Sequence, residues 1–144
     1  MTRQFFDQID DELRGLLGPS RRDFQSIRTS HLIKVWYHRP EFHFEAQHVG
    51  ARWTRPHRKG PGIEVGLHLE APTAEANDEL LASMSGWQSK LPDAFAGKAL
   101  GPRASLWRRV SELVDVESMD DSDFAGEIAE RLALYIKTLD PFIR

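Results

Sequence analysis

Two His-x-Glu pairs, His43-Phe44-Glu45 and His68-Leu69-Glu70, are the residues whose types and spacing could do chemistry. Imidazole nitrogens and carboxylate oxygens ligate Zn²⁺ and other divalent ions, and a histidine beside a carboxylate can act as a general acid or base. Both pairs lie in segments that alternate apolar and polar residues, the pattern of a strand with one buried face. Residues i and i+2 of a strand point the same way, so each histidine shares a sheet face with its glutamate.

Two interpretations of these pairs stay open. If the two strands are neighbours, His43 lies near His68 and Glu45 near Gly66, or the pairing is shifted by two residues, and His43, Glu45, His68 and Glu70 could hold a metal ion. The other interpretation is the polar face of an antiparallel sheet, which commonly faces water. No His-Glu-x-x-His motif, activated nucleophile or oxyanion element accompanies the pairs. The sequence therefore favours a non-catalytic binding or interaction domain without a cofactor, which uses this polar face and the basic loop at 52–59, with a metal-dependent or nuclease-like enzyme as the alternative.

A second candidate site is a run of cations at 52–59 that contains no acid. Guanidinium and ammonium groups can neutralise phosphates, and an indole can stack on a base or an arginine. The run predicts an anionic partner, nucleic acid included; the alternative is a solvated loop that keeps a strand edge soluble. The expected binding residues of this loop are Arg52, Trp53, Arg55, Arg58 and Lys59.

The first His-x-Glu pair lies in a predicted hairpin, and the pairing of its two strands can be predicted from the sequence. Residues 31–38 and 41–49 flank the turn Arg39-Pro40, and one register gives an apolar ladder on one face and an opposite-charge pair on the other. In this register the residues that face each other across the two strands are Ile33 and Ala46, Lys34 and Glu45, Val35 and Phe44, and Trp36 and His43. Trp36 thus falls on the polar face, where an exposed aromatic suits a protein partner or a second copy of the chain.

The remaining elements follow from periodicity and from turn residues. A third strand is expected at 63–70, with Gly66 leaving a shallow spot on its polar row, and the second strand could continue to Trp53. Helices are expected over 2–17, from Pro72-Thr73 to 91, and from Asp120 to 140. The segments 19–30 and 92–103 are expected to be irregular, with Phe24, Ile27, Phe95 and Leu100 anchored on the core. Residues 104–116 fit a helix or a strand, and the strand is favoured because of the β-branched content and the Pro/Gly loop before it.

These elements predict a single α+β domain over residues 1–144, an antiparallel three- to four-stranded meander with helices packed on one face, in the order α-β-β-β-α-(β)-α. The chain has no cysteine, which excludes disulfides and thiolate metal sites. No apolar run approaches the ~18 residues of a membrane span, and the N-terminus lacks the apolar core of a signal peptide, so a cytoplasmic protein without membrane contact is expected. The net charge of −3 gives no general attraction to nucleic acid.

Several of these features occur together in one known kind of domain. They are the aromatic N-terminal helix, the strand Gly62–Glu70, a helix with Asn77 and Leu80, the turn Leu100-Gly101 before Trp107, and a last helix that runs to Pro141. In this outline the chain resembles a small bacterial α+β domain found attached to restriction-type nuclease proteins. The resemblance implies a setting in DNA defence or maintenance and carries over no catalytic residue. A nuclease of that type needs Glu/Asp-x-Lys on a strand, and Glu64-Val65-Gly66 and Glu70-Ala71-Pro72 have no lysine.

Overall fold

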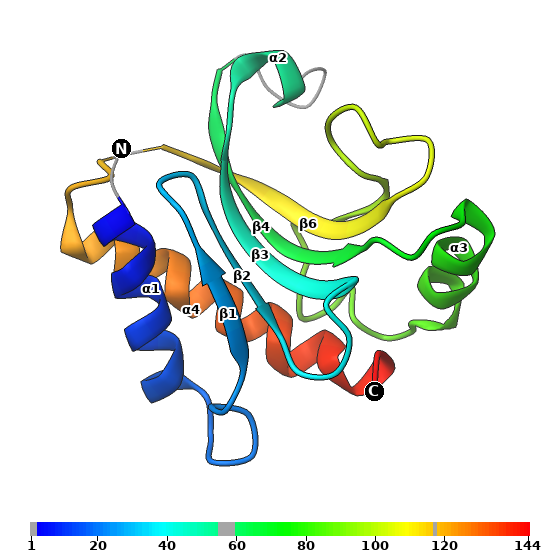
Figure 1. Ribbon diagram of the computed structural model, residues 1–144, viewed down its shortest axis with the longest axis horizontal. Helices are drawn as coiled ribbons and strands as arrows, with labels where there is room; N and C mark the ends of the chain where they lie inside the picture. Colours follow the sequence, from blue (N-terminus) through cyan, green and yellow to red (C-terminus); the bar gives the residue numbers. More distant parts are fainter. Residues whose placement is uncertain (1–2, 55–59, 117) are drawn as a thin grey trace.

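Six antiparallel strands form one open sheet with four α-helices in the computed structural model, which describes residues 3–54, 60–116 and 118–144 (Figure 1). The strands lie in the order β1-β2-β3-β4-β6-β5 across the sheet. The elements are α1 (Arg3–Leu16), β1 (Gln25–Arg28), β2 (Leu32–Trp36), β3 (Phe42–Val49), α2 (Ala51–Thr54), β4 (Gly62–Leu69), α3 (Ala74–Ser83), β5 (Phe95–Lys98), β6 (Arg108–Asp115), α4 (Ser122–Leu139) and a 3-10 turn (Asp140–Phe142).

The predicted α+β class and antiparallel pairing are confirmed, but the strand count is too low. The first four strands form a meander, after which the chain passes through α3 to the edge strand β5 and returns as β6 between β4 and β5. The segment 104–116 therefore contains a strand, as the β-branched content favoured. The missed strands β1 and β5 have four residues each, too few for alternation to be seen against their polar surroundings.

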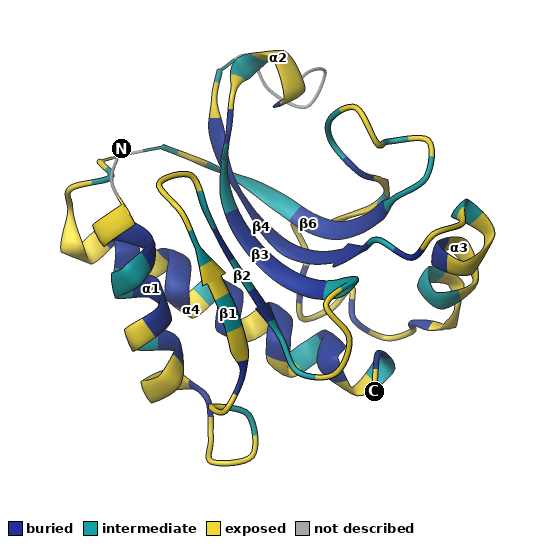
Figure 2. Cartoon of the chain, in the orientation of Figure 1, coloured by how far each residue is buried: buried dark blue, intermediate teal, exposed yellow. Residues whose placement is uncertain are grey.

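One face of the sheet carries the core. Helices α1 and α4 pack side by side on this face, where they contact β2, β3 and β4 (Figures 1 and 2). Hydrophobic burial of this kind is the main source of stability in a domain of this size. The fully buried strand residues on this face are Ile33, Val35, Phe44, Ala46, Ile63, Val65, Leu67, Leu69 and Val110.

The predicted register of the first hairpin is confirmed at three of its pairs, including Ile33 opposite Ala46. Lys34 lies opposite Glu45 and Val35 opposite Phe44. The pairing of β3 with β4 is the unshifted alternative, with His43 opposite His68 and Glu45 opposite Gly66. These two registers bring the His-x-Glu pairs together on the face away from α1 and α4.

Four local predictions are wrong. Ile27 is 51% exposed because it pairs with Lys34 and so points away from the helices, whereas Phe24 is buried as expected. The helix that starts after the Thr73 cap ends at Ser83, and Trp87 and Leu91 are buried from the turns that follow. The second strand stops at Val49, where α2 begins, and Phe95 is 43% exposed rather than anchored.

Helices α1 and α4 both match their expected ranges. The Asp121 side chain caps α4 by accepting a hydrogen bond from the Asp123 backbone N–H. No helix among the described residues combines the length and apolar character that a membrane crossing requires.

Candidate functional site

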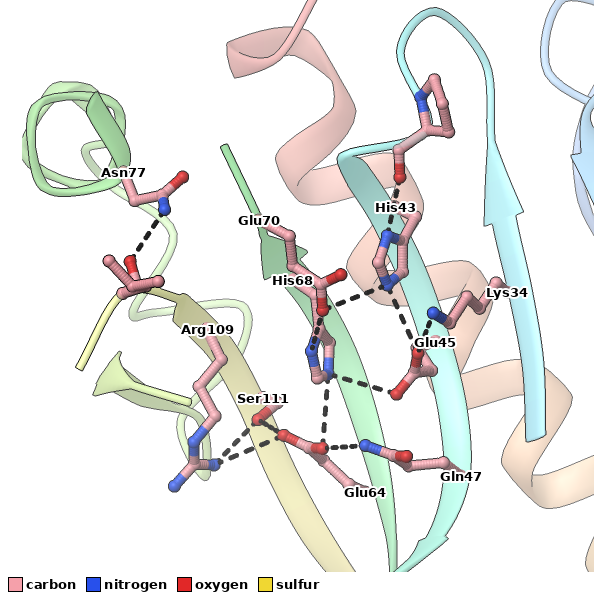
Figure 3. A network of polar contacts seen from close by, with 12 residues as sticks. Lys34, His43, Glu45, Gln47, Glu64, His68, Glu70, Asn77, Arg109 and Ser111 are labelled. Atoms are coloured by element: carbon pink, nitrogen blue, oxygen red, sulfur yellow. Dashed lines mark hydrogen bonds and ion pairs between the residues drawn. The ribbon is translucent and has the colours of Figure 1, made fainter. Parts of the chain in front are cut away.

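The face of the sheet opposite α1 and α4 holds a cluster of ionisable side chains that is buried, not exposed to water (Figures 2 and 3). The interpretation of this face as one that faces water is therefore wrong where the two histidines lie. His43 is 2% exposed and Glu64 is 0% exposed, and every residue of β4 is buried, whichever face of the sheet it lies on. We call this set the His/Glu cluster; it comprises His43, Glu45, Glu64, His68 and Glu70.

The His43 ring is held in one orientation by the chain at the β2–β3 turn. Its Nδ1 lies 2.8 Å from the carbonyl oxygen of Pro40, so Nδ1 carries the proton and donates to that oxygen. Its Nε2 is directed into the cluster, 3.3 Å from Glu45 Oε1 and 3.8 Å from Glu70 Oε2. This nitrogen is buried and makes no hydrogen bond. In the neutral ring it therefore presents a lone pair to two carboxylates.

The His68 ring lies between the three carboxylates of the cluster. Its Nδ1 is 3.7 Å from Glu70 Oε2, and its Nε2 is 3.3 Å from Glu64 Oε1 and 3.7 Å from Glu45 Oε2. The Nε2 atom is also buried without a hydrogen bond. The rings of His43 and His68 stack at 5.5 Å between centroids with an interplanar angle of 10°.

Glu64 is fixed by hydrogen bonds from both neighbouring strands. Gln47 Nε2 donates to Glu64 Oε1 at 2.8 Å, and Ser111 Oγ donates to Glu64 Oε2 at 2.7 Å. Arg109 donates to Ser111 Oγ at 2.8 Å, and the same nitrogen lies 3.8 Å from Glu64 Oε2. The Arg109 guanidinium is itself held by the Lys98 carbonyl of β5 at 3.1 Å. The carboxylate of Glu64 is thus oriented before any ligand arrives.

Charge in the cluster shifts the pKa of its members in opposite directions. Burial acts to raise the pKa of Glu64, but the charge of His68 and the hydrogen bonds from Ser111 and Gln47 lower it to about 2. Burial acts to lower the pKa of His68, but Glu64 and Glu45 raise it well above 6.5. For Glu70, the two histidines outweigh burial, so the pKa of this carboxyl is lowered. The charges of the cluster are therefore strongly coupled.

Two cations complete the charge balance at the edges of the cluster. Lys34 Nζ lies 3.9 Å from Glu45 Oε1, and Arg109 faces Glu64 from β6. With His68 protonated, three carboxylates face three cations. The charges of this network balance without a bound ion. Its carboxylates and imidazoles are also groups that could serve as ligands to a divalent ion.

Two overlapping triads in the cluster have metal-ligand spacing. In each triad, His43–His68–Glu70 and Glu45–Glu64–His68, one ligand atom per residue lies within 4.8 Å of the others. Donor atoms about 2.0–2.2 Å from a tetrahedral ion are roughly 3.3–3.6 Å apart. The separations between glutamate oxygens and imidazole nitrogens within the triads are 3.3–3.8 Å, and the remaining edge of each triad is within 4.8 Å, so an ion would draw the ligand atoms closer together.

Glu70 is positioned by the chain at the end of β4. Its backbone N–H donates to the Glu41 carbonyl at 2.8 Å. The next residue, Ala71, is held at both its N–H and its carbonyl by the buried side chain of Asn77. At 15% exposure of its side chain, Glu70 is the member of the His/Glu cluster that is most open to solvent.

The structure describes only part of the predicted surface around Trp36 and the basic loop. Trp36 is half-buried in β2. Arg52 and Trp53 lie in α2, with the Arg52 guanidinium 4.6 Å from the Trp53 ring centroid. A cavity of about 220 Å³ is lined by Trp53, by Gln47 and by the segment 100–102. Arg55, Arg58 and Lys59 lie outside the described residues.

Sequence reasoning missed four members of the network: Gln47, Glu64, Arg109 and Ser111. A signal for Glu64 was present, since it lies on the same alternating row of its strand as His68 and Glu70. Arg109 and Ser111 could be found only once β6 and its register beside β4 were known.

Comparison of the chain with protein-family models, with curated proteins and with solved structures gives no match. The resemblance to a nuclease-associated domain therefore stays a prediction, and function has to be argued from the geometry of the site.

Proposed function

We propose that this protein is a metal-binding domain that holds a divalent ion through His43 Nε2, His68 Nδ1 and Glu70. The observation that carries the proposal is the buried Nε2 of His43, which makes no hydrogen bond and faces two carboxylates. An unsatisfied buried polar atom costs about 1–3 kcal/mol. A cation between this nitrogen and the carboxylates would remove that cost.

The groups behind the ligands support the proposal. Histidines that bind metals almost always donate their other N–H to a carbonyl or a carboxylate, which fixes the ring and the tautomer. His43 has such a partner in the Pro40 carbonyl. His68 has one within reach in Glu64, which Gln47 and Ser111 hold in place. Glu45 Oε1, 3.3 Å from His43 Nε2, adds negative charge beside the ion without being one of its three ligands.

The burial of the ligands favours a stored or structural ion over a catalytic one. Catalytic metal sites keep a coordination position open to substrate. Here both imidazoles and Glu45 are almost fully buried, and Glu70 alone in the His/Glu cluster has appreciable exposure. An ion at this position would join the end of β4 to β3 and so stabilise the centre of the sheet.

The test is metal binding by untagged, metal-depleted protein, followed by calorimetry and by thermal unfolding with Zn²⁺. We expect one ion per chain, an increase in Tm on addition of Zn²⁺, and loss of both effects in His43→Gln. His48→Gln is the matched control, because His48 lies in the same strand but outside the cluster. Wild-type protein that binds no divalent ion, with a Tm unchanged by Zn²⁺ and by EDTA, would overturn the proposal.

We propose anion binding at α2 as a second function, in keeping with the basic composition of 52–59. Its support is Trp53, which is 36% exposed beneath the Arg52 guanidinium and beside the 220 Å³ cavity. Aromatic stacking with a neighbouring cation is a common way to hold single-stranded nucleic acid. Salt-sensitive binding of a single-stranded oligonucleotide should be weakened in Trp53→Ala and unaffected in Arg22→Ala, an exposed arginine elsewhere. Equal binding by both variants would contradict this function.

A further inference from the structure

We infer that the His/Glu cluster contains two mutually exclusive ion positions, one at each nitrogen of His68, and that they sort divalent ions by donor type. This inference rests on the proposed metal-binding function and adds the class of ion that each position takes. It follows from the two triads, which share His68 and no other residue.

The two positions lie on opposite sides of the His68 ring. The outer position is bounded by His68 Nδ1, His43 Nε2 and Glu70 Oε2, with separations of 3.7 and 3.8 Å from Glu70 to the two nitrogens. The inner position is bounded by His68 Nε2, Glu64 Oε1 at 3.3 Å and Glu45 Oε2 at 3.7 Å. Figure 3 shows the Glu70 contact leaving one nitrogen of His68 and the Glu64 and Glu45 contacts leaving the other.

Each position accounts for one of the two buried histidine nitrogens that lack a hydrogen bond. His43 Nε2 belongs to the outer triad, and His68 Nε2 belongs to the inner one. One ion therefore cannot satisfy both through direct ligation. When the ion occupies the outer position, it displaces the Nδ1 proton, and the proton that His68 keeps is on Nε2, where Glu64 is the acceptor.

Occupation of one position excludes the other because of the chemistry of a neutral imidazole, which has one lone pair and one N–H. An ion at Nδ1 leaves the proton on Nε2, facing Glu64 and Glu45. An ion at Nε2 leaves the proton on Nδ1, facing Glu70. Each tautomer therefore has a carboxylate in place to receive its N–H, so the structure supports both states.

Charge gives a second reason for single occupancy. Three carboxylates of the cluster already face the cations of Lys34 and Arg109. One dication bound to a neutral His68 nearly balances this set. A second dication would leave a buried region strongly positive, which is costly in a medium of low dielectric constant.

The two positions differ in the donors that they offer. The outer position has two imidazoles and one carboxylate, while the inner position has one imidazole and two carboxylates. Imidazole suits Zn²⁺ and the later first-row ions, and carboxylate oxygen suits Mn²⁺. We therefore assign Zn²⁺ to the outer position and Mn²⁺ to the inner position.

The experiment compares Zn²⁺ and Mn²⁺ affinities of metal-depleted wild type, His43→Gln and Glu64→Gln, with Mn²⁺ followed by electron paramagnetic resonance. His43→Gln removes a ligand of the outer position, so it should lower Zn²⁺ affinity by more than about 100-fold and leave Mn²⁺ affinity nearly unchanged. Substitution of a residue that only supports a ligand typically lowers metal affinity by about 10–100-fold. Glu64→Gln should lower Mn²⁺ affinity by more than about 100-fold and Zn²⁺ affinity by only about 10-fold, since Glu64 is then a supporting residue for Zn²⁺. In wild type, saturating Zn²⁺ should release the bound Mn²⁺.

The outcomes separate this inference from the function on which it rests. If both variants weaken both ions to the same extent, there is one position, and the inference is wrong while metal binding stands. If Mn²⁺ stays bound at saturating Zn²⁺, the positions are not exclusive and the inference is equally overturned. If wild type binds neither ion, the proposed function itself has failed. Circular dichroism checks the fold of each variant, and Glu70→Gln, a second outer-position variant, replaces His43→Gln if that protein does not fold.

Discussion

The two faces of β4 are equally buried, yet they are filled with opposite kinds of side chain. Toward α1 and α4 the strand presents Ile63, Val65, Leu67 and Leu69, and away from them it presents Glu64, Gly66 and His68. The first face is stabilised by the removal of apolar surface from water, which needs no exact partner for each atom. The second face is tolerated only because each charge has an opposite charge or a hydrogen-bond partner nearby.

This difference indicates that the two faces serve different purposes. A buried ionic cluster is a poor way to gain stability, since well-packed apolar residues of similar size often do as well or better. Strongly shifted pKa values of buried groups that converge on one point are more typical of functional sites. The apolar face therefore explains why the chain folds, and the His/Glu cluster explains what the folded chain could hold.

The largest loss of stability should come from a substitution that disrupts the packing of the apolar face alone. Phe44→Ala removes a fully buried ring opposite Leu67 and should lower the free energy of unfolding by about 4 kcal/mol, from lost burial and from the cavity left behind. Urea unfolding with EDTA and with Zn²⁺ should give the same loss, because Phe44 points away from the cluster. Phe95→Ala, at a half-exposed ring, is the control and should cost much less. A loss for Phe44→Ala that depends on Zn²⁺ would contradict the separation of the two faces.

The pH dependence of the stability of metal-depleted protein should report on the polar face, because its ionisable groups have shifted pKa values. The pKa of Glu64 falls from 4.5 to about 2 on folding, so its contribution, on the order of 3 kcal/mol, is present above pH 4.5 and is lost as the pH falls toward 2. The pKa of His68 is raised above 6.5, so its contribution is present below pH 6.5 and is lost as the pH rises through the folded value.

Stability should therefore be greatest between about pH 4.5 and 6.5, as measured by urea midpoints from pH 3 to 9. His68→Gln should remove the decline on the alkaline side, and His48→Gln should retain it. A wild-type curve that keeps rising through pH 8 would show that the coupling of His68 to Glu64 is much weaker than the structure indicates.

The apolar and the polar face also differ in how far the sequence could predict them. The register of β2 with β3 was predictable because alternation and the turn at Arg39-Pro40 both specify it, and a shift by one residue would expose Phe44. The apolar faces of β3 and β4 followed directly from their period of two. These predictions depend only on local pattern, and the structure confirms them.

The state of the polar face could not be predicted, because it depends on residues that are distant in sequence. Glu64 is buried only because β6 lies beside β4 and places Arg109 and Ser111 next to it. Alternation shows that His68 and Glu64 share a face, but it cannot show whether that face is covered. The sequence therefore led to the two histidines and to a wrong expectation of how exposed they are.

A smaller effect should follow from crowding the polar face without changing its charge. Gly66 lies between Glu45 and Ser111, and a Cβ added there would lie 2.2 Å from the Val110 carbonyl oxygen. Gly66→Ala should therefore force the backbones of β4 and β6 apart and cost about 2 kcal/mol of stability. It should also weaken Zn²⁺ binding, since His68 and Glu64 flank the position. Gly50→Ala, where an added Cβ meets no atom within 4 Å, is the control in the same assays. Equal stability of the two variants would show that the strand pairing adapts at Gly66.

The smallest effect should come from the edge of the cluster, where water still reaches. Lys34 is about one third exposed and lies 3.9 Å from Glu45 Oε1, so solvent screens the pair, and Lys34→Gln should lower stability by only about 0.5 kcal/mol. Its effect on metal affinity should have the opposite sign, because removal of a cation beside the carboxylates favours a bound dication. Calorimetry should therefore show slightly tighter Zn²⁺ binding in Lys34→Gln at low salt and no change in Lys90→Gln, an exposed lysine away from the cluster. Weaker Zn²⁺ binding in Lys34→Gln would mean that Lys34 orients Glu45 for the ion, so that even the solvent-exposed edge of the polar face is organised around its ligands.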